Sequence, residues 1–142
     1  MQAWDYFKAF ATGIAVLALN LLTLVLLVFG YSQFVEPGHP PEFYNEAAPR
    51  LGSISAPIAG AVLMFLLAWL LSSRKPQRNA YAFAITTFIS YFAVDTALGL
   101  AASPASELFQ APFLFGMGGA CIAALVGAFM ATNGRKSAGA SS

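Results

Sequence analysis

The sequence predicts an all-α membrane protein: a polytopic bundle of four transmembrane helices with one longer outer loop. Charged residues make up only 9% of the 142 residues, against about 25% in soluble domains. Apolar residues make up 58% of the chain, and the mean hydropathy is +0.70. The placement of the few charges then indicates how many helices there are and where each one ends.

Charged residues mark the ends of four long apolar segments. Residues 9–35, 51–73 and 108–134 contain no charge, and residues 79–106 contain only Asp95. A helix needs about 20 apolar residues to cross a hydrocarbon core of about 30 Å, so each segment is long enough for one crossing. The expected helices span approximately residues 8–31, 53–72, 79–101 and 108–132.

These bounds give one transmembrane domain, residues 1–132, with residues 32–52 as its outer loop. The first apolar segment is expected to remain as a helix, because it is much longer than the ~7–15 residues of a signal-peptide core. Residues 133–142, "NGRKSAGASS", contain a helix-stopping Asn-Gly, two cations and then small polar residues. This composition predicts a disordered cytoplasmic tail.

The distribution of Lys and Arg predicts the orientation of the bundle. Only Arg50 falls on one side of the expected membrane. The other six cations share the opposite side: Lys8, Arg74, Lys75, Arg78, Arg135 and Lys136. Because Lys and Arg accumulate in cytoplasmic segments, both termini are expected in the cytoplasm and the chain in the cell (inner) membrane.

Small residues recur every four positions along the fourth expected helix. They form two adjacent rows: Gly116, Ala120, Ala124 and Ala128, and Gly119, Ala123, Gly127 and Ala131. Such rows let another helix approach closely, so that dispersion and weak Cα–H contacts hold the two together. The partner helix belongs either to the same bundle or to another chain, in a homo-oligomer or a larger membrane complex.

Two polar residues lie deep in the expected membrane: Asn20 in the first helix and Asp95 in the third. Counted from the cytoplasmic ends of their helices, the two differ in depth by about one helical turn at most. An aspartate near the bilayer centre costs about 2.5–3.5 kcal/mol on insertion scales, so it should face the bundle. We therefore expect Asp95 near Asn20, within hydrogen-bonding reach.

Hydroxyl groups follow Asp95 down one face of the third helix. Tyr91 lies four residues before Asp95 and Thr87 eight before, with Thr86 and Ser90 beside them. One interpretation is a polar stripe that gives protons or cations access to the carboxyl. The other is a structural carboxyl, neutral or hydrogen-bonded, that fixes the packing of its helix.

The outer loop contains one histidine and two carboxylates at close spacing: His39, Glu42 and Glu46. A nitrogen and two carboxylates are a set that can bind a divalent metal. His39, however, precedes two prolines and lies outside the short helix that Pro41 could start. A solvated acidic face is the better interpretation, and we expect no metal site.

The sequence contains few groups with which to build an enzyme. It has one His and one Cys and lacks HExxH, P-loop and GxGxxG motifs. We therefore expect no catalysis and no cofactor, and the net charge of +1 makes nucleic acid an unsuitable partner. The sequence slightly favours a membrane subunit or assembly module that acts through its small-residue helix. The alternative is a small oligomeric proton- or cation-coupled transporter or channel that uses Asp95 with Asn20.

Overall fold

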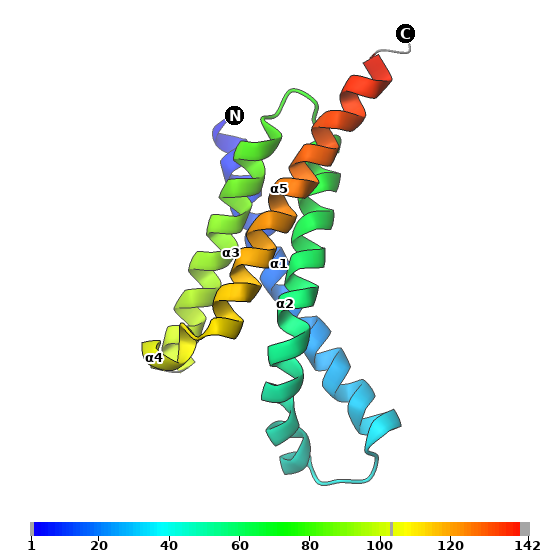
Figure 1. The fold of residues 1–142 in the computed structure, drawn as a ribbon, viewed down its shortest axis with the longest axis vertical. Helices are drawn as coiled ribbons and strands as arrows, with labels where there is room; N and C mark the ends of the chain where they lie inside the picture. Colours follow the sequence, from blue (N-terminus) through cyan, green and yellow to red (C-terminus); the bar gives the residue numbers. More distant parts are fainter. Residues whose placement is uncertain (1, 103, 140–142) are drawn as a thin grey trace.

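The computed structural model describes residues 2–102 and 104–139 (Figure 1). The structure is 88% helix, and the described residues contain no strand. In chain order the elements are α1 (Ala3–Gly30), the π-helix η1 (Tyr31–Val35), α2 (Pro41–Ser73), α3 (Ala80–Ala102), α4 (Ala105–Leu108) and α5 (Ala111–Gly139).

Four helical segments are long and apolar enough to cross a membrane, which confirms the predicted fold class. They are Ala3–Val35, Pro41–Ser73, Ala80–Ala102 and Ala111–Gly134. Each has at least 23 residues, more than the roughly 20 that a crossing needs. The protein is therefore a small integral membrane protein with several spans.

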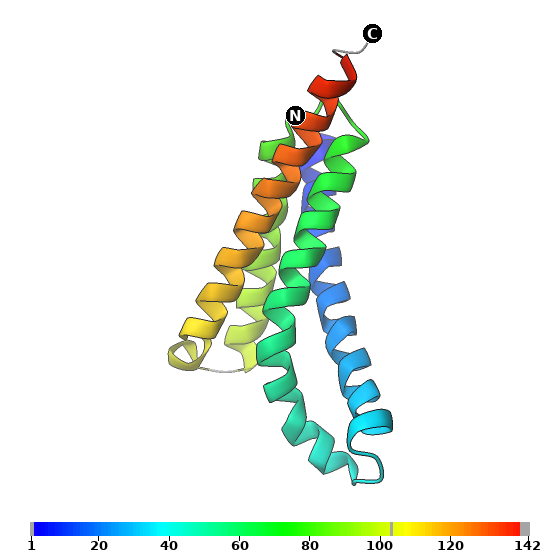
Figure 2. The same ribbon diagram turned by 45° about the vertical axis from the view of Figure 1, so that its right-hand side comes forward.

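The second helix begins much earlier than the sequence predicted. α2 starts at Pro41 and continues through Pro49 and Pro57, so the expected loop 32–52 shrinks to residues 36–40. Pro fits the first turn of a helix, where its missing N–H costs no hydrogen bond. Internal prolines are tolerated in membrane helices when neighbouring groups satisfy the freed carbonyls. Figure 2 shows the helix bending in its teal N-terminal part.

The other helix ends also differ from their predicted positions. α1 begins at Ala3 instead of residue 8, since the Gln2 N–H donates to Asp5 Oδ2 at 3.2 Å and closes the first turn. α3 begins one residue later than predicted, where the Asn79 side chain accepts from the Ala82 N–H at 3.0 Å.

The expected disordered tail is helical over most of its length. α5 continues through the Asn-Gly pair to Gly139, because neither residue takes the left-handed conformation that ends a helix. Residues 140–142 of that predicted tail lie outside the described residues. At the other end, residues 108–110 belong to α4 and its link, so the fourth span begins at Ala111.

The helices form two hairpins that pack together at one end and diverge at the other (Figures 1 and 2). Neighbouring pairs are α1–α2, α2–α5, α5–α3 and α3–α1, of which α2–α5 is the most extensive. We call the end with both chain termini the termini end, and the opposite one the loop end. Toward the loop end, α1 and α2 form one arm, and α3, α4 and α5 form the other.

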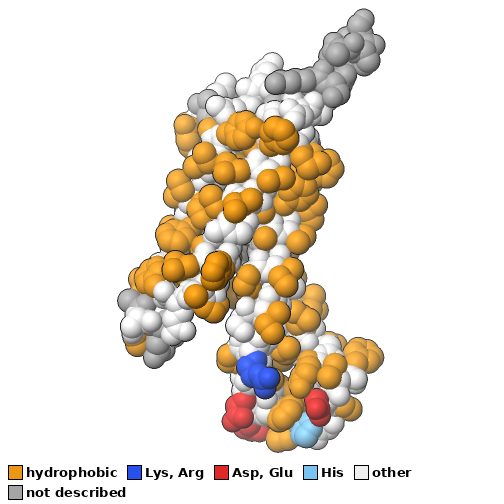
Figure 3. All heavy atoms as spheres, in the orientation of Figure 1, with side chains coloured by type: hydrophobic (Ala, Val, Ile, Leu, Met, Phe, Trp, Pro, Cys, Tyr) orange, Lys and Arg blue, Asp and Glu red, His pale blue; other side chains and the backbone are white. Residues whose placement is uncertain are grey.

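The two arms differ in length. α1 with η1, and α2, have 33 residues each, whereas α3 has 23. At about 1.5 Å per residue these are about 50 Å and about 35 Å long. The excess projects at the loop end, where Figure 3 shows charged side chains at the tip of the long arm and hydrophobic ones along most of the visible surface.

The core lies in the half of the bundle where all four long helices are together. Its members include Val16, Leu17, Met64, Ala68, Ala80, Ala84, Tyr91, Met117, Ala120, Ala124 and Ala128. Alanines dominate the contribution of α5, so its backbone lies close to α2. The helices are therefore held by close approach rather than by large interlocking side chains.

A buried ion pair joins the first helix to the α2–α3 connection at the termini end. Arg78 Nε lies 3.0 Å from Asp5 Oδ1, and the two side chains are 5% and 13% exposed. The Arg78 guanidinium also lies over the Phe83 ring, 4.2 Å from its centroid. A largely buried pair of this kind needs well-placed partners on both sides, and it ties α1 to the α2–α3 connection.

Candidate functional site

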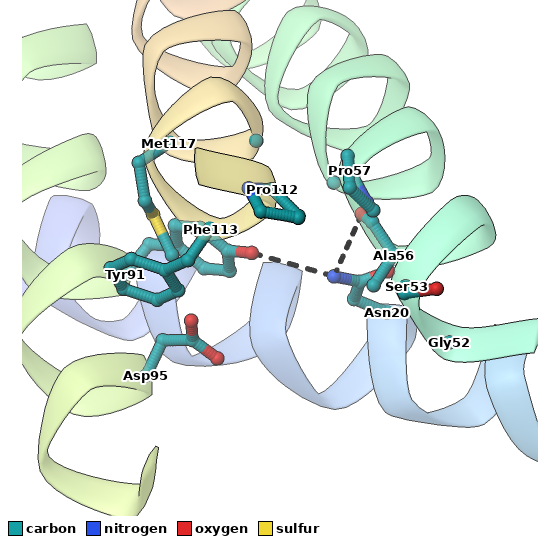
Figure 4. Close-up of a pocket in the computed structure, with 12 residues that line it drawn as sticks. Asn20, Gly52, Ser53, Ala56, Pro57, Tyr91, Asp95, Pro112, Phe113 and Met117 are labelled. Atoms are coloured by element: carbon teal, nitrogen blue, oxygen red, sulfur yellow. Dashed lines mark hydrogen bonds between the residues drawn. The ribbon is translucent and has the colours of Figure 1, made fainter. Parts of the chain in front are cut away.

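A cavity of about 230 Å³ lies where the arms diverge, and all four long helices contribute to its wall (Figure 4). Its main polar groups are Asn20 from α1 and Tyr91 and Asp95 from α3. The rest of the wall comes from α2 and α5: Gly52, Ser53, Ala56, Pro57, Gly60, Pro112, Phe113, Gly116 and Met117. We call it the Asp95 pocket; three of the predicted polar residues meet there.

Asn20 links three helices through its amide group. Its Nδ2 donates to the Tyr91 hydroxyl at 3.4 Å and to the Ala56 carbonyl of α2 at 3.3 Å. Its Oδ1 is buried and has no hydrogen-bond partner among the described residues. A buried acceptor without a donor is costly, so the site has unused capacity for a donor.

Asp95 faces the pocket beside Tyr91, as Figure 4 shows. The predicted hydrogen bond between Asn20 and Asp95 is absent, because the Asn20 amide is directed to Tyr91 and Ala56 instead. In the part of the chain that the structure describes, the Asp95 carboxyl has no hydrogen bond or ion pair. Its oxygens are therefore available to a ligand in the pocket.

The hydroxyl-bearing residues that precede Asp95 on α3 pack tightly against α1. Thr87 is fully buried and lies outside the pocket wall. The hydroxyl of Ser90 donates to the Thr86 carbonyl of its own helix at 2.9 Å. Gly13 of α1 lies so close that an added Cβ would be 2.7 Å from Ser90 Cβ and from the Thr87 carbonyl oxygen. The stripe thus gives no open path from the termini end.

Gly60 is a wall residue that the sequence reasoning missed. A Cβ there would lie 3.2 Å from the Tyr91 hydroxyl and 3.3 Å from Asn20 Nδ2, so a small residue is needed opposite the Asn20–Tyr91 pair. Phe113, whose ring lines the pocket, was also missed. Both occur in apolar runs, where only the register between helices distinguishes a wall residue from a lipid-facing one.

Most of the small residues on α5 pack inside the bundle. Ala120, Ala124 and Ala128 are at most 1% exposed. A Cβ on Gly127 would lie 2.6 Å from the Phe65 carbonyl oxygen of α2. A Cβ on Gly116 would meet Pro57 at 3.3 Å, also from α2.

Gly119 does not belong to this internal contact. A Cβ at Gly119 or at its neighbour Gly118 would meet no described atom within 4 Å, and Ala123 is only partly buried. The predicted rows therefore serve two surfaces. The residues against α2 hold the bundle together, and Gly118 and Gly119 face open space on its outside.

The three outer-loop residues considered in the sequence analysis, His39, Glu42 and Glu46, do not converge as metal ligands would. His39 Nε2 lies 3.3 Å from Glu36 Oε2, and its ring stacks on Phe43 with 4.2 Å between centroids. Glu42 and Glu46 are exposed on α2. Across residues 2–102 and 104–139, no three His, Cys, Asp or Glu side chains group as metal ligands would.

The loop is instead held by the side chain of Tyr44, a residue of α2, which forms hydrogen bonds with the loop backbone. The Tyr44 hydroxyl donates to the Glu36 carbonyl at 2.7 Å and accepts from the His39 N–H at 3.2 Å. Gly38 turns the chain with φ +87°, a conformation that other residues seldom adopt.

No protein-family model, curated protein or solved structure matches this chain.

Proposed function

We propose that this protein is a small proton- or cation-coupled transporter that binds its cation in the Asp95 pocket. The observation that carries the proposal is a carboxyl with no partner of its own among the described residues, in a cavity where four spanning helices meet. Ionisable residues inside a membrane are expensive, and they commonly mark ion or substrate paths.

The groups in the pocket favour a cation with hydrogen-bond donors. Asp95 and Asn20 Oδ1 offer acceptor oxygens, and the rings of Tyr91 and Phe113 add aromatic surface. A cation over an aromatic face gains about 0.5–2 kcal/mol. The cavity of about 230 Å³ lies below the ~300–1,000 Å³ of sites for drug-sized molecules. The expected ligand is thus a proton or a small organic cation.

A proton and a cation would compete for the same carboxyl. An uncompensated carboxylate is unfavourable in a pocket of low dielectric constant, and either ligand neutralises it. Because only one can do so at a time, binding of the cation releases the proton. Such mutually exclusive occupancy is the simplest chemical basis for exchange of a cation against protons.

The geometry of the bundle favours access from one side. The pocket lies at the divergence of the arms, whereas the close α1–α3 contact at Gly13 separates it from the termini end. Transport requires a second conformation with the opposite access, reached by rocking one hairpin against the other. By the distribution of Lys and Arg, the termini would be cytoplasmic and the membrane an inner membrane. A second copy beside the arms would complete a homo-oligomer.

The test is a flux measurement with the purified protein in liposomes. Under an imposed proton gradient with the lumen acidic, we expect uptake of labelled guanidinium, with the matching loss of protons from the lumen reported by a pH dye. Protein-free liposomes give the background. If Na⁺, K⁺, guanidinium and tetramethylammonium all fail to move above that background, and no proton moves, the transport proposal is wrong.

A second candidate is a non-catalytic membrane subunit, favoured by the open space beside Gly118 and Gly119 on α5. A Cβ added at either glycine would meet nothing described within 4 Å, and the adjacent Phe115 and Ile122 are 80% and 64% exposed. Two small residues flanked by large apolar ones would suit a helix of another membrane protein. Neither candidate requires enzymatic chemistry.

Substitution of Gly119 by leucine tests this second candidate. We expect Gly119→Leu to fold normally, because nothing described lies within 4 Å of the new side chain's Cβ. Its partner proteins should be lost from mild-detergent purification, since a leucine occupies the space that a partner helix would need. The measurement is the mass of the purified complex in native gels. An unchanged complex, or wild-type protein that is isolated alone and active in flux, would count against a subunit role.

A further inference from the structure

Two cavities adjoin at the termini end and share three cationic residues: Arg74, Lys75 and Arg78. The first, of about 450 Å³, is polar and is completed by Gln2, Asp5, Pro76 and Gln77. The second, of about 470 Å³, is an apolar groove between α1 and α2. Both are remote from the Asp95 pocket in sequence and share no wall residue with it.

The shared rim has an excess of positive charge. Lys8, Arg74, Lys75 and Arg78 line the two cavities, and Asp5 is the acid among the lining residues. Asp5 forms an ion pair with Arg78 and so holds the Arg78 guanidinium in place. Arg74 is exposed, so its planar guanidinium is accessible to the paired oxygens of a phosphate.

The apolar groove extends from this rim along the spanning helices. Ala11 and Ala15 leave space on α1, opposite Leu67 and Leu71 on α2. Phe7 of α1 and Phe83 of α3 also line it. From residue 7 to residue 15 a helix rises about 12 Å, so the groove lies within the part of the bundle that contacts lipid tails.

We propose that this combined site binds one anionic phospholipid. Its phosphate would lie on Arg74 and Lys75, and one acyl chain would occupy the groove between α1 and α2. Charge complementarity selects an anionic headgroup, and basic pockets at the membrane surface are known to bind such lipids. The apolar groove favours a lipid over free phosphate as the ligand. Free phosphate could bind the cations but has no apolar part to fill the groove beside them.

The test is lipid retention by the full-length protein in native mass spectrometry, after exchange into equal amounts of phosphatidylglycerol and phosphatidylcholine. We expect one phosphatidylglycerol to be retained selectively. The double variant R74Q/K75Q should retain it roughly thirtyfold more weakly, as expected for the loss of two surface cations. The matched control R50Q, at the other end of α2, should retain it like the wild type.

Two further measurements separate a lipid from a soluble anion. Ala15→Leu keeps every cation but narrows the groove, so it should reduce phosphatidylglycerol retention. Millimolar inorganic phosphate should leave that retention unchanged. Equal retention of both lipids by the wild type, an equal loss in R50Q, full retention in Ala15→Leu or displacement by phosphate would each overturn the proposal. Because the wild-type selectivity is itself decisive, the test stands even where a variant fails to fold.

Discussion

Asp95→Asn is expected to lose proton-coupled cation uptake in liposomes and to bind guanidinium about ten- to a hundredfold more weakly. The amide has nearly the shape of the carboxyl but can neither carry a negative charge nor exchange a proton. Hydrogen bonds to a charged group contribute about 1.5–3 kcal/mol, and 1.4 kcal/mol corresponds to tenfold in affinity. Equilibrium binding of labelled guanidinium and uptake into liposomes measure the two effects.

Two controls define what this result would mean. Glu46→Gln removes an exposed acid from the N-terminal part of α2, away from the pocket wall, and should transport like the wild type. Thermal unfolding of Asp95→Asn should resemble that of the wild type, because no described hydrogen bond is lost. A variant that still drives proton-coupled uptake would make Asp95 a structural carboxyl, the other interpretation of this residue.

Gly127→Ala is expected to destabilise the bundle by about 1–3 kcal/mol, the usual cost of overpacking a core. The new methyl group would lie 2.6 Å from the Phe65 carbonyl oxygen and 3.0 Å from the Trp69 backbone nitrogen. Both are backbone atoms of α2, so no side chain can turn aside and the helices must separate. Thermal unfolding in detergent, followed by circular dichroism, measures the loss.

Gly118→Ala is the matched control, since it adds the same methyl group to the same helix. No described atom lies within 4 Å of that position, and alanine is favoured over glycine in a helix by about 1 kcal/mol. The control should unfold at the wild-type temperature or slightly above it. Equal unfolding temperatures for Gly127→Ala and Gly118→Ala would mean that α2 and α5 do not pack as closely as described.

The four spans could be predicted because charges are excluded from the membrane whatever the packing. Asp95 and Asn20 could be assigned to one level by counting residues along helices, and both line one pocket. Their exact partners could not be predicted. Whether the Asn20 amide meets Asp95, Tyr91 or a carbonyl of α2 depends on how three helices are rotated about their axes. Counting residues along a helix does not give that rotation.

The start of α2 was missed because its local signals conflict. Pro49 and three charged residues, Glu42, Glu46 and Arg50, suggest a loop, yet the helix continues through all of them. The position of α2 in the bundle depends on contacts with residues that are distant in the sequence. The Asp5–Arg78 pair was missed for a similar reason, because each charge alone resembles an ordinary membrane-flanking residue.

The unequal arms have a consequence for the surrounding lipid. Phe34 and Val35, on the projecting part of the long arm, are 85% and 63% exposed, so apolar surface continues beyond the reach of the shorter arm. One molecule therefore presents two hydrophobic lengths to a single bilayer. Hydrophobic mismatch of this kind is relieved by tilting or by local thickening, at a fraction of a kcal/mol per ångström. Lipid beside the long arm is stretched, while lipid beside the short arm is not. A change in membrane thickness would therefore favour a different angle between the two arms.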